Sequence, residues 1–369
     1  QEYKELQETI AEFKSILGDR TKLMAIVKDD LLSIKSKYAN KRRTHISAQS
    51  GTLDVEDLIA EEDVVVMITK QGYIKRLPLN TYRSQRRGGR GVIGMQTKDE
   101  DYVEHIFVAN TLDTMLFFTT KGLVHQLKTY QIPDASRQSR GTSVVNLLQI
   151  DKEEIITAVI SIKDFEEEAD LMMITKQGRI KRTELKEYDT RLKRGLIAMK
   201  LEEDDELVSV VKVKDDDQVF IATSDGKAIR IEVPDVRCMG RATTGVKGIE
   251  LSRRDFVVSM DVVKPGESYV LTITENGYGK RTRIDEYRTQ GRGGKGLINM
   301  KVNKKTGNVV GSRMVYGNEE EEVIIATREA IVLKTSVDRI SVQGRSTQGV
   351  LVMRPEPGDK VVAVALSEE

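Results

Sequence analysis

An arginine- and glycine-rich stretch, SQRRGGRGVIG at residues 84–94, is the segment best suited to bind phosphate. Arg86, Arg87 and Arg90 each carry a planar guanidinium, which can donate two parallel hydrogen bonds to phosphate oxygens. Glycine lets the backbone come close enough to donate its N–H groups to the same oxygens. The stretch therefore suits either a nucleotide cradle or one contact point on a longer nucleic-acid track.

The nucleotide cradle is the weaker of these two interpretations. The pattern G-x-G-x-x-G occurs at Gly89–Gly94 and again at Gly291–Gly296. A dinucleotide site needs a strand before this motif and a helix after it. The adjoining residues, VIGM and LINM, are typical of strands, and the chain has no G-x-x-x-x-G-K-[ST] motif. We therefore favour the track.

Other chemistry finds little support in the sequence. His45, His105 and His125 are widely spaced and have no cysteine or histidine at ligand spacing, so we expect no metal site. No nucleophile–base arrangement stands out, and we predict no catalytic residue and no cofactor in this chain. The single cysteine, Cys238, argues against a disulfide scaffold. No apolar run approaches the ~18 residues of a membrane span, so we expect no membrane partner.

A repeat organises the rest of the chain. Six apolar, β-branched runs such as VVVMITKQG and VFIATSDG each end at a turn, and a glycine follows each turn at a regular spacing. The turn residues, which we call first markers, are Gly72, Gly122, Gly178, Gly226, Gly277 and Ala330. The second markers are Gly91, Gly141, Gly195, Gly245, Gly296 and Gly349. The two markers lie 19 residues apart in five repeats and 17 apart in the third, a regularity that argues against chance.

Each repeat is typical of about four short strands, because Val, Ile and Thr are enriched between glycine turns. Six such units predict an all-β, propeller-like radial array with six blades over residues 59–369. A row of separate small barrels or sandwiches is the alternative. Leu6, Ile10, Phe13 and Leu17, and then a second face from Leu23 to Tyr38, predict two short α-helices over 1–38, with a polar linker at 39–58.

Charge is partitioned in phase with this repeat. The six windows from first to second marker hold 29 Lys and Arg against 9 Asp and Glu, whereas the rest of the chain holds 30 against 49. In a radial array the basic loops would occupy equivalent places and form a belt. Such a belt suits duplex DNA, which carries about one negative charge per 1.7 Å of its axis.

Tyr82, Tyr188 and Tyr287 each follow a first marker by ten residues and could stack on bases. The same position holds Ile132, Val236 and Ile340 in the other repeats. An apolar anchor that holds the loop down explains all six residues, so we predict packing. This interpretation favours double-stranded over single-stranded nucleic acid.

The segment QRRGGRG, Gln85 to Gly91, resembles the gyrase-A box, the signature of the C-terminal domain of the DNA gyrase A subunit. A near copy, QGRGGKG, stands at Gln290–Gly296, with Gly291 where the box has a basic residue. The resemblance covers residues 50–369 and implies a six-bladed β-pinwheel, whose outer strands are exchanged between neighbouring blades and whose rim bends duplex DNA. Residues 1–38 are similar to the helical tail of the breakage–reunion domain.

The resemblance further implies that the chain is part of an ATP-dependent type II topoisomerase that introduces negative supercoils, in a holoenzyme of two A and two B subunits. ATP and Mg²⁺ would bind through the B subunit, and the DNA-cleaving tyrosine would lie in the breakage–reunion part. It also implies a cytoplasmic, nucleoid-associated bacterial protein, and an isolated domain that is a monomer. The alternatives are the C-terminal domain of the topoisomerase IV A subunit, in which the box is degraded, and a propeller that binds an acidic protein.

The residues expected to contact DNA come from all six windows. The box contributes Gln85, Arg86, Arg87, Gly88, Gly89, Arg90 and Gly91, and the remaining contacts are expected from Lys75, Arg76, Arg137, Arg140, Arg191, Lys193, Arg194, Arg237, Arg241, Arg288, Arg292, Lys295 and Arg345. Such contacts fix the DNA backbone without reading bases.

Overall fold

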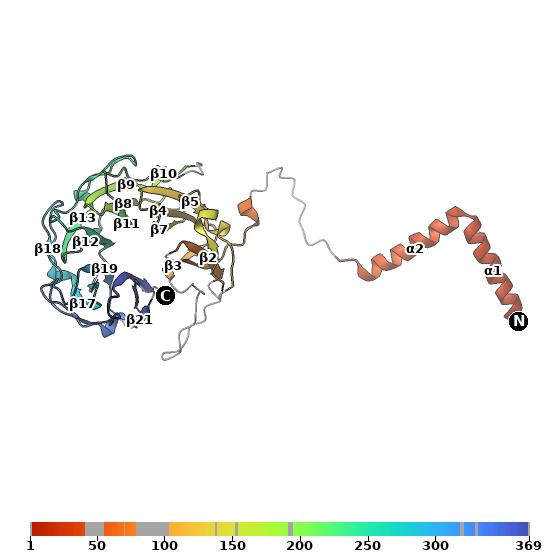
Figure 1. Cartoon of the computed structure of the whole chain (residues 1–369). Helices are drawn as coiled ribbons and strands as arrows, with labels where there is room; N and C mark the ends of the chain where they lie inside the picture. The colour runs from red at the N-terminus through yellow and green to blue at the C-terminus, as the bar shows by residue number, and fades with distance from the viewer. Residues whose placement is uncertain are drawn as a thin grey trace. The chain divides into compact units, whose positions relative to one another are not determined.

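A computed structural model describes residues 2–40, 55–69, 71–78, 103–136, 139–151, 154–190, 195–317, 321–328 and 331–367. The chain divides into two compact units, Gln1–Asp54 and Val55–Glu369. The two helices form the first unit and the β-structure forms the second (Figure 1).

The first unit holds two helices, α1 (Glu2–Gly18) and α2 (Arg20–Tyr38), as the periodicity predicts. Asp19 ends one helix and begins the next, because its carboxylate accepts a hydrogen bond of 2.8 Å from the N–H of Thr21 as an N-cap. No residue of either helix is buried within the described part of the chain. Neither helix has the length and hydropathy of a membrane span.

The second unit is a ring of six antiparallel sheets, which we call blades 1 to 6 (Figure 1). Within this unit, a short 3₁₀ helix, η1 (Val55–Leu58), precedes the first blade. Each blade has three strands of its own: β1 (Asp63–Thr69), β2 (Tyr73–Pro78) and β3 (Val103–Asn110); β4 (Thr114–Thr119), β5 (Leu123–Lys128) and β7 (Ile156–Ile162); β8 (Asp170–Thr175), β9 (Arg179–Glu184) and β11 (Leu207–Val213); β12 (Gln218–Thr223), β13 (Lys227–Glu232) and β15 (Val257–Val262); β16 (Tyr269–Thr274), β17 (Tyr278–Arg283) and β19 (Val309–Val315); β20 (Glu322–Thr327), β21 (Val332–Ser336) and β23 (Val361–Ser367).

The outermost strand of blades 1 to 5 comes from the following blade. These donated strands are β6 (Thr142–Ser143), β10 (Leu196–Ile197), β14 (Val246–Lys247), β18 (Leu297–Ile298) and β22 (Val350–Leu351). The third strands, β11, β15, β19 and β23, contact one another on the inner side of the ring, and β23 also contacts β3. The last blade therefore lies beside the first, so the array is a ring and not a row of separate barrels.

A second-marker glycine precedes each donated strand for a steric reason. Gly245 has a φ of +76°, and a Cβ built on it would lie 2.5 Å from the carbonyl oxygen of Ile180 in the preceding blade. Gly349 meets the carbonyl of Gly279 at the same distance. Only glycine allows the donated strand to approach this closely, so the regular spacing of the second markers reflects strand exchange.

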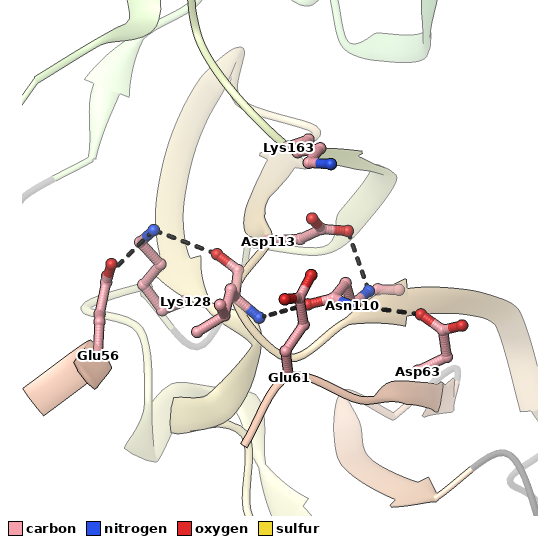
Figure 2. Close-up of a pocket in the computed structure, with 9 residues that line it drawn as sticks. Glu56, Glu61, Asp63, Asn110, Asp113, Lys128 and Lys163 are labelled. Atoms are coloured by element: carbon pink, nitrogen blue, oxygen red, sulfur yellow. Dashed lines mark hydrogen bonds and ion pairs between the residues drawn. The ribbon is translucent and has the colours of Figure 1, made fainter. Parts of the chain in front are cut away.

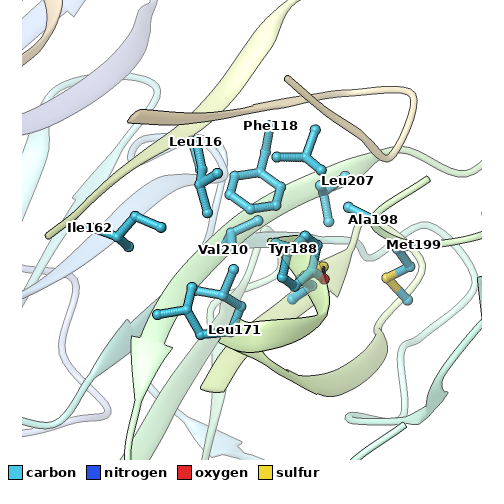
Figure 3. Packing of buried hydrophobic residues seen from close by; sticks show 13 residues of the cluster. Leu116, Phe118, Ile162, Leu171, Tyr188, Ala198, Met199, Leu207 and Val210 are labelled. Atoms are coloured by element: carbon cyan, nitrogen blue, oxygen red, sulfur yellow. Dashed lines mark hydrogen bonds between the residues drawn. The ribbon is translucent and has the colours of Figure 1, made fainter. Parts of the chain in front are cut away.

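The predicted loop anchors lie in the cores between blades. Tyr188 and Tyr287 are buried, as are Ile132, Val236 and Ile340 at the equivalent position. Figure 3 shows Tyr188 among Phe118, Leu116 and Leu171, which belong to blades 2 and 3. The prediction that this position packs is confirmed for these five residues, whereas Tyr82 lies outside the described residues.

Candidate nucleic-acid interface

The segments that lead into the donated strands carry the basic windows to the outer edge of the ring. We call these segments rim loops: residues 133–136 and 139–141 in blade 2, 237–245 in blade 4, 288–296 in blade 5 and 341–349 in blade 6. Single β-bridges fix the start of each against the second strand of the preceding blade, at Arg76↔Asp134, Arg182↔Cys238, Arg230↔Thr289 and Arg281↔Val342. Because the bridges occur at one common position, the described rim loops occupy equivalent places around the ring.

Part of the predicted contact set cannot be placed. The whole box lies outside the described residues, namely Gln85, Arg86, Arg87, Gly88, Gly89, Arg90 and Gly91, and so do Arg137, Arg191, Lys193 and Arg194. Their DNA contacts stay predictions.

Three predicted residues point their charge outward. Arg237, Arg288 and Lys295 are exposed, and none of them forms an ion pair with a described residue. Arg237 lies in the rim loop of blade 4, and the other two lie in the rim loop of blade 5. Their side chains are free to meet a polyanion.

A shared position unites three further arginines. Arg241, Arg292 and Arg345 each stand four residues before a second marker, as do Arg87, Arg137 and Arg191 in the remaining repeats. An arginine at this position in all six repeats is the strongest single sequence signal for the interface. Arg292 is exposed, and its Nε donates to the Asp235 carbonyl in the neighbouring blade at 3.0 Å. Arg241 and Arg345 are half-buried at the rim, where the Nε of Arg241 lies 3.9 Å from a carboxylate oxygen of Glu187 and the guanidinium of Arg345 lies 5.8 Å from the ring centre of Tyr287.

Three other residues of the predicted DNA-contact set bind the protein itself, namely Lys75, Arg76 and Arg140. The ammonium of Lys75 is completely buried beneath the rim loop of blade 2, where it donates to the carbonyls of Ser136 and Ser139 at 3.2 and 2.9 Å. The prediction that Lys75 touches DNA is therefore wrong, since its charge supports the loop from within. Arg76 pairs with Asp134 at 2.8 Å, and Arg140 lies 4.5 Å from the ring centre of Tyr73. Both of these side chains are already engaged by the protein.

Two more buried lysines repeat the arrangement of Lys75. Lys181 in blade 3 and Lys280 in blade 5 also stand three residues after a first marker and are 0% exposed. Burial lowers the pKa of each to about 8, and it lowers the pKa of Lys75 as well. The common role of these lysines was not predicted from the sequence. Each of them lies three residues after a first marker, and this regularity could have indicated that they share a role.

Blade 2 carries a histidine at the same place. His125 is buried, and its Nε2 lies 3.7 Å from a carboxylate oxygen of Glu154. Burial lowers the pKa of His125, while the Glu154 carboxylate opposes that effect. A Cβ on Gly195, the second marker of blade 3, would lie 2.6 Å from the imidazole ring. His125 therefore supports the strand that blade 3 donates.

The hollow beside blades 1 and 2 has the wrong charge for a phosphate. Figure 2 shows four carboxylates lining it, from Glu56, Glu61, Asp63 and Asp113, together with Lys128 and Lys163. Lys128 is already bound to Glu56 at 3.1 Å and to the Leu112 carbonyl at 3.2 Å. The motif Gly291–Gly296 leads directly into strand β18 and not into a helix, so it does not form a dinucleotide cradle. Within the described ranges, no group of three or more His, Cys, Asp or Glu could hold a metal ion.

Comparisons with known proteins agree with this geometry. The family described as DNA gyrase C-terminal domain, beta-propeller matches six times, at residues 63–110, 113–163, 169–214, 217–264, 268–315 and 321–368. The DNA gyrase A subunit of Clostridium acetobutylicum is 51% identical over 364 residues, which are 99% of this chain and 44% of that relative. The chain thus spans less than half the length of this relative.

Two solved structures have the same fold. One is described as the C-terminal domain of DNA topoisomerase IV, with a TM-score of 0.72 and 26% identity, and it covers 84% of this chain and 94% of the other. The second is described as a DNA gyrase A C-terminal domain, with a TM-score of 0.68 and 30% identity over 83% of this chain and 99% of the other.

Proposed function

Because the chain belongs to the family of DNA gyrase C-terminal β-propeller domains, we propose that it binds duplex DNA along its rim loops without base preference and bends the DNA around the ring. The observation that carries this proposal is the common placement of the rim loops at the outer edge of successive blades. The six windows together hold 29 Lys and Arg against 9 Asp and Glu, and the four windows that contain these loops hold 16 against 6.

A surface that bends DNA must offset the free-energy cost of bending the duplex. A 40–90° bend over 20–30 base pairs costs on the order of 1–6 kcal/mol. Charge-assisted contacts from arginines and backbone N–H groups to the phosphates offset this cost, since each new blade adds contacts only if the duplex curves. A protein that holds DNA in one curved path also fixes the sense in which a second segment crosses it.

The activity of the whole protein follows as part of the proposal. The relatives are named as the A subunits of DNA gyrases and are more than twice as long as this chain. We infer that this domain gives an ATP-dependent type II topoisomerase its direction toward negative supercoiling. The cleaving tyrosine would lie in the breakage–reunion part of the polypeptide, and ATP and Mg²⁺ would bind through a B subunit in an A₂B₂ complex in the bacterial cytoplasm, at the nucleoid. The domain alone would be a monomer.

The topoisomerase IV A subunit is the second candidate, because its C-terminal domain has the same fold. The intact QRRGGRG segment and the 51% identity to a gyrase A subunit favour gyrase. A propeller that binds an acidic protein is the candidate from a different class, and it would also explain the basic windows.

A binding titration at several salt concentrations, combined with a topology assay, tests the proposal. If the chain neutralises many phosphates, the logarithm of the affinity for duplex DNA falls steeply with the logarithm of salt, by about 0.9 for each phosphate contacted. Nicked circles that are religated with the chain bound should then differ in linking number from circles religated alone. Weak binding that does not grow with DNA length, with an unchanged linking number, would instead indicate a protein adaptor.

A further inference from the structure

Buried lysines support alternate rim loops. Lys75, Lys181 and Lys280 belong to blades 1, 3 and 5, and their ammonium groups bond to the rim loops of blades 2, 4 and 6. At the same position, blades 2, 4 and 6 carry His125, Ile229 and Leu333. A buried charge under every second loop is costly unless its hydrogen bonds are needed there.

In the rim loop of blade 4, Lys181 donates to the carbonyls of Gly240 and Arg241, the first at 3.1 Å. The hydroxyl of Thr243 also donates to the Gly240 carbonyl, at 2.9 Å. The N–H of Arg241 donates to the carboxylate of Glu187 at 3.4 Å. Each of these bonds engages a polar group of the rim loop, and together they restrict the conformation of the loop backbone.

The rim loop of blade 6 repeats this pattern bond for bond. Lys280 donates to the carbonyls of Gly344 and Arg345, both at 2.6 Å. Thr347 donates to Gly344 at 2.8 Å, and the N–H of Arg345 donates to Glu286 at 3.2 Å. Two loops about a hundred residues apart in the sequence therefore share one conformation, and in both the carbonyl of the shared arginine is held by a buried ammonium.

The bond between Lys181 and the Arg241 carbonyl determines the direction of the N–H that follows, which belongs to Ala242. In a planar trans peptide the C=O and the following N–H point in opposite directions. Since the Arg241 carbonyl is drawn inward to Lys181, the N–H of Ala242 faces outward, and the N–H of Ser346 does so in blade 6. Ala242 and Ser346 are exposed, and their N–H groups have no acceptor among the described residues. A surface hollow at this point is lined by Glu187, Ile197, Gly240, Arg241, Ala242 and Thr243.

We propose that Lys181 and Lys280 are positioning residues that aim the amides of Ala242 and Ser346 at phosphate groups of the bound duplex, beside the guanidiniums of Arg241 and Arg345. The inference rests on the proposed function. The buried ammonium touches no phosphate, and its effect is transmitted through one peptide plane. A fixed backbone donor next to an arginine forms a small anion-binding unit that needs no reordering when DNA arrives.

The distribution of Lys and Arg differs between rim loops that lie over a buried lysine and rim loops that do not. Without the buried lysine that each contains, the windows of blades 1, 3 and 5 hold 5, 6 and 5 Lys and Arg, while those of blades 2, 4 and 6 hold 3, 4 and 3. The loops with fewer cations are those under which a lysine lies. Oriented backbone donors there replace part of the side-chain charge that the other windows supply.

The test uses the whole chain with Lys181→Met and Lys280→Met together, and Lys181→Ile as a second variant, since Ile229 occupies this position in blade 4. Lys214→Met, which removes one exposed lysine outside the windows, is the matched control for the net charge of Lys181→Ile. Affinity for a duplex is measured over a range of salt. The amide resonances of Ala242 and Ser346 are followed while inorganic phosphate, and then a short duplex, is added.

We expect the double variant to bind about tenfold more weakly, as for the loss of one or two oriented hydrogen bonds, with the salt slope unchanged. The Ala242 and Ser346 resonances should shift with phosphate in the unaltered chain and in Lys214→Met, but the Ala242 shift should be lost in Lys181→Ile. A slope that falls by about 0.9 for each lysine replaced would show direct contact and overturn the inference. Unchanged affinity and unchanged amide shifts would overturn it as well. If the unaltered chain bound no duplex, the proposed function would fail, and this inference with it.

Discussion

The ring of Tyr287 meets the ring of Phe220 edge-on across the boundary between blades 5 and 4, with centroids 5.0 Å apart and ring planes 84° apart. The Tyr287 hydroxyl donates to Asn299 at 2.6 Å, and Asn299 in turn donates to Thr272 at 3.1 Å. Tyr287 also begins the segment that becomes the rim loop of blade 5. One side chain thus connects the core between two blades to the start of a predicted DNA contact.

Tyr287→Phe should lower the free energy of unfolding by about 1–3 kcal/mol, because it removes the short hydrogen bond to the buried Asn299 oxygen and leaves only the 3.4 Å bond from the Thr272 hydroxyl. Tyr188→Phe is the matched control, since the Tyr188 hydroxyl lies 3.9 Å from the Met173 sulfur, a weaker acceptor, and we expect a smaller loss. Urea unfolding of the two variants measures both values. Equal losses would contradict the role assigned to the Asn299 bond.

Gly245→Ala should weaken the exchange of strand β14. The new Cβ would lie 2.5 Å from the Ile180 carbonyl, and the φ of +76° is unfavourable for alanine. We expect a loss of roughly 1–3 kcal/mol in stability, with faster hydrogen exchange at Val246 and Lys247. Gly266→Ala is the control, because Gly266 also has a positive φ but would meet nothing within 4 Å. If both variants lost the same stability, backbone strain alone would explain the effect.

Glu187→Gln combined with Glu286→Gln should strengthen DNA binding. Glutamine keeps an oxygen that can accept from the N–H of Arg241 or Arg345, while it removes a negative charge beside the rim. We expect a gain of about two- to tenfold in affinity at low salt, which shrinks as salt screens the charge. Asp216→Asn, an exposed acid outside the windows, should have little effect. Weaker binding in the double variant would mean that the carboxylate charge is needed to hold the loop.

The buried lysines predict a pH dependence of stability. Folding lowers the pKa of Lys181 and Lys280 to about 8, from 10.5 in the unfolded chain. Between these values the unfolded state binds more protons, so the contribution of each lysine to the free energy of unfolding rises with pH. Relative to the Lys181→Met and Lys280→Met double variant, the unaltered chain should therefore gain stability between about pH 8 and pH 9.5. Urea unfolding at both pH values measures the difference, and a constant or falling difference would refute the sign.

Replacement of Arg86, Arg87 and Arg90 with alanine tests the box in the full-length polypeptide, in complex with its partner. If the box starts or locks the wrap, ATP-driven supercoiling should be abolished while relaxation of DNA persists. Arg253→Ala with Arg254→Ala, which removes exposed charge outside the six windows, is the control. An equal loss of both activities in the box variant would argue against a role in wrapping.

Much of the architecture could be read from local pattern. The spacing of the first and second markers predicted six blades, because five of the six first markers and the residue before every donated strand are glycines at fixed places. The helix break at Asp19 and the packing of Tyr188 and Tyr287 were also predictable, since capping chemistry and the apolar residues at equivalent positions leave few alternatives.

The candidate interface was only partly predictable, and Lys75 shows why. Its charge and its position in a basic window predicted a DNA contact. Its burial depends on the neighbouring blade that covers its strand. The residues around Lys75 in the sequence do not indicate which part of the chain that is. The same holds for the pairing of Arg76 with Asp134 and for the outward amides of Ala242 and Ser346. Residue types and spacing settled the number of blades and the phase of the charge, because these depend on contacts within one repeat. Whether a Lys or Arg side chain lies at the surface or beneath a rim loop depends on contacts between repeats. These contacts form only when the blades pack against one another.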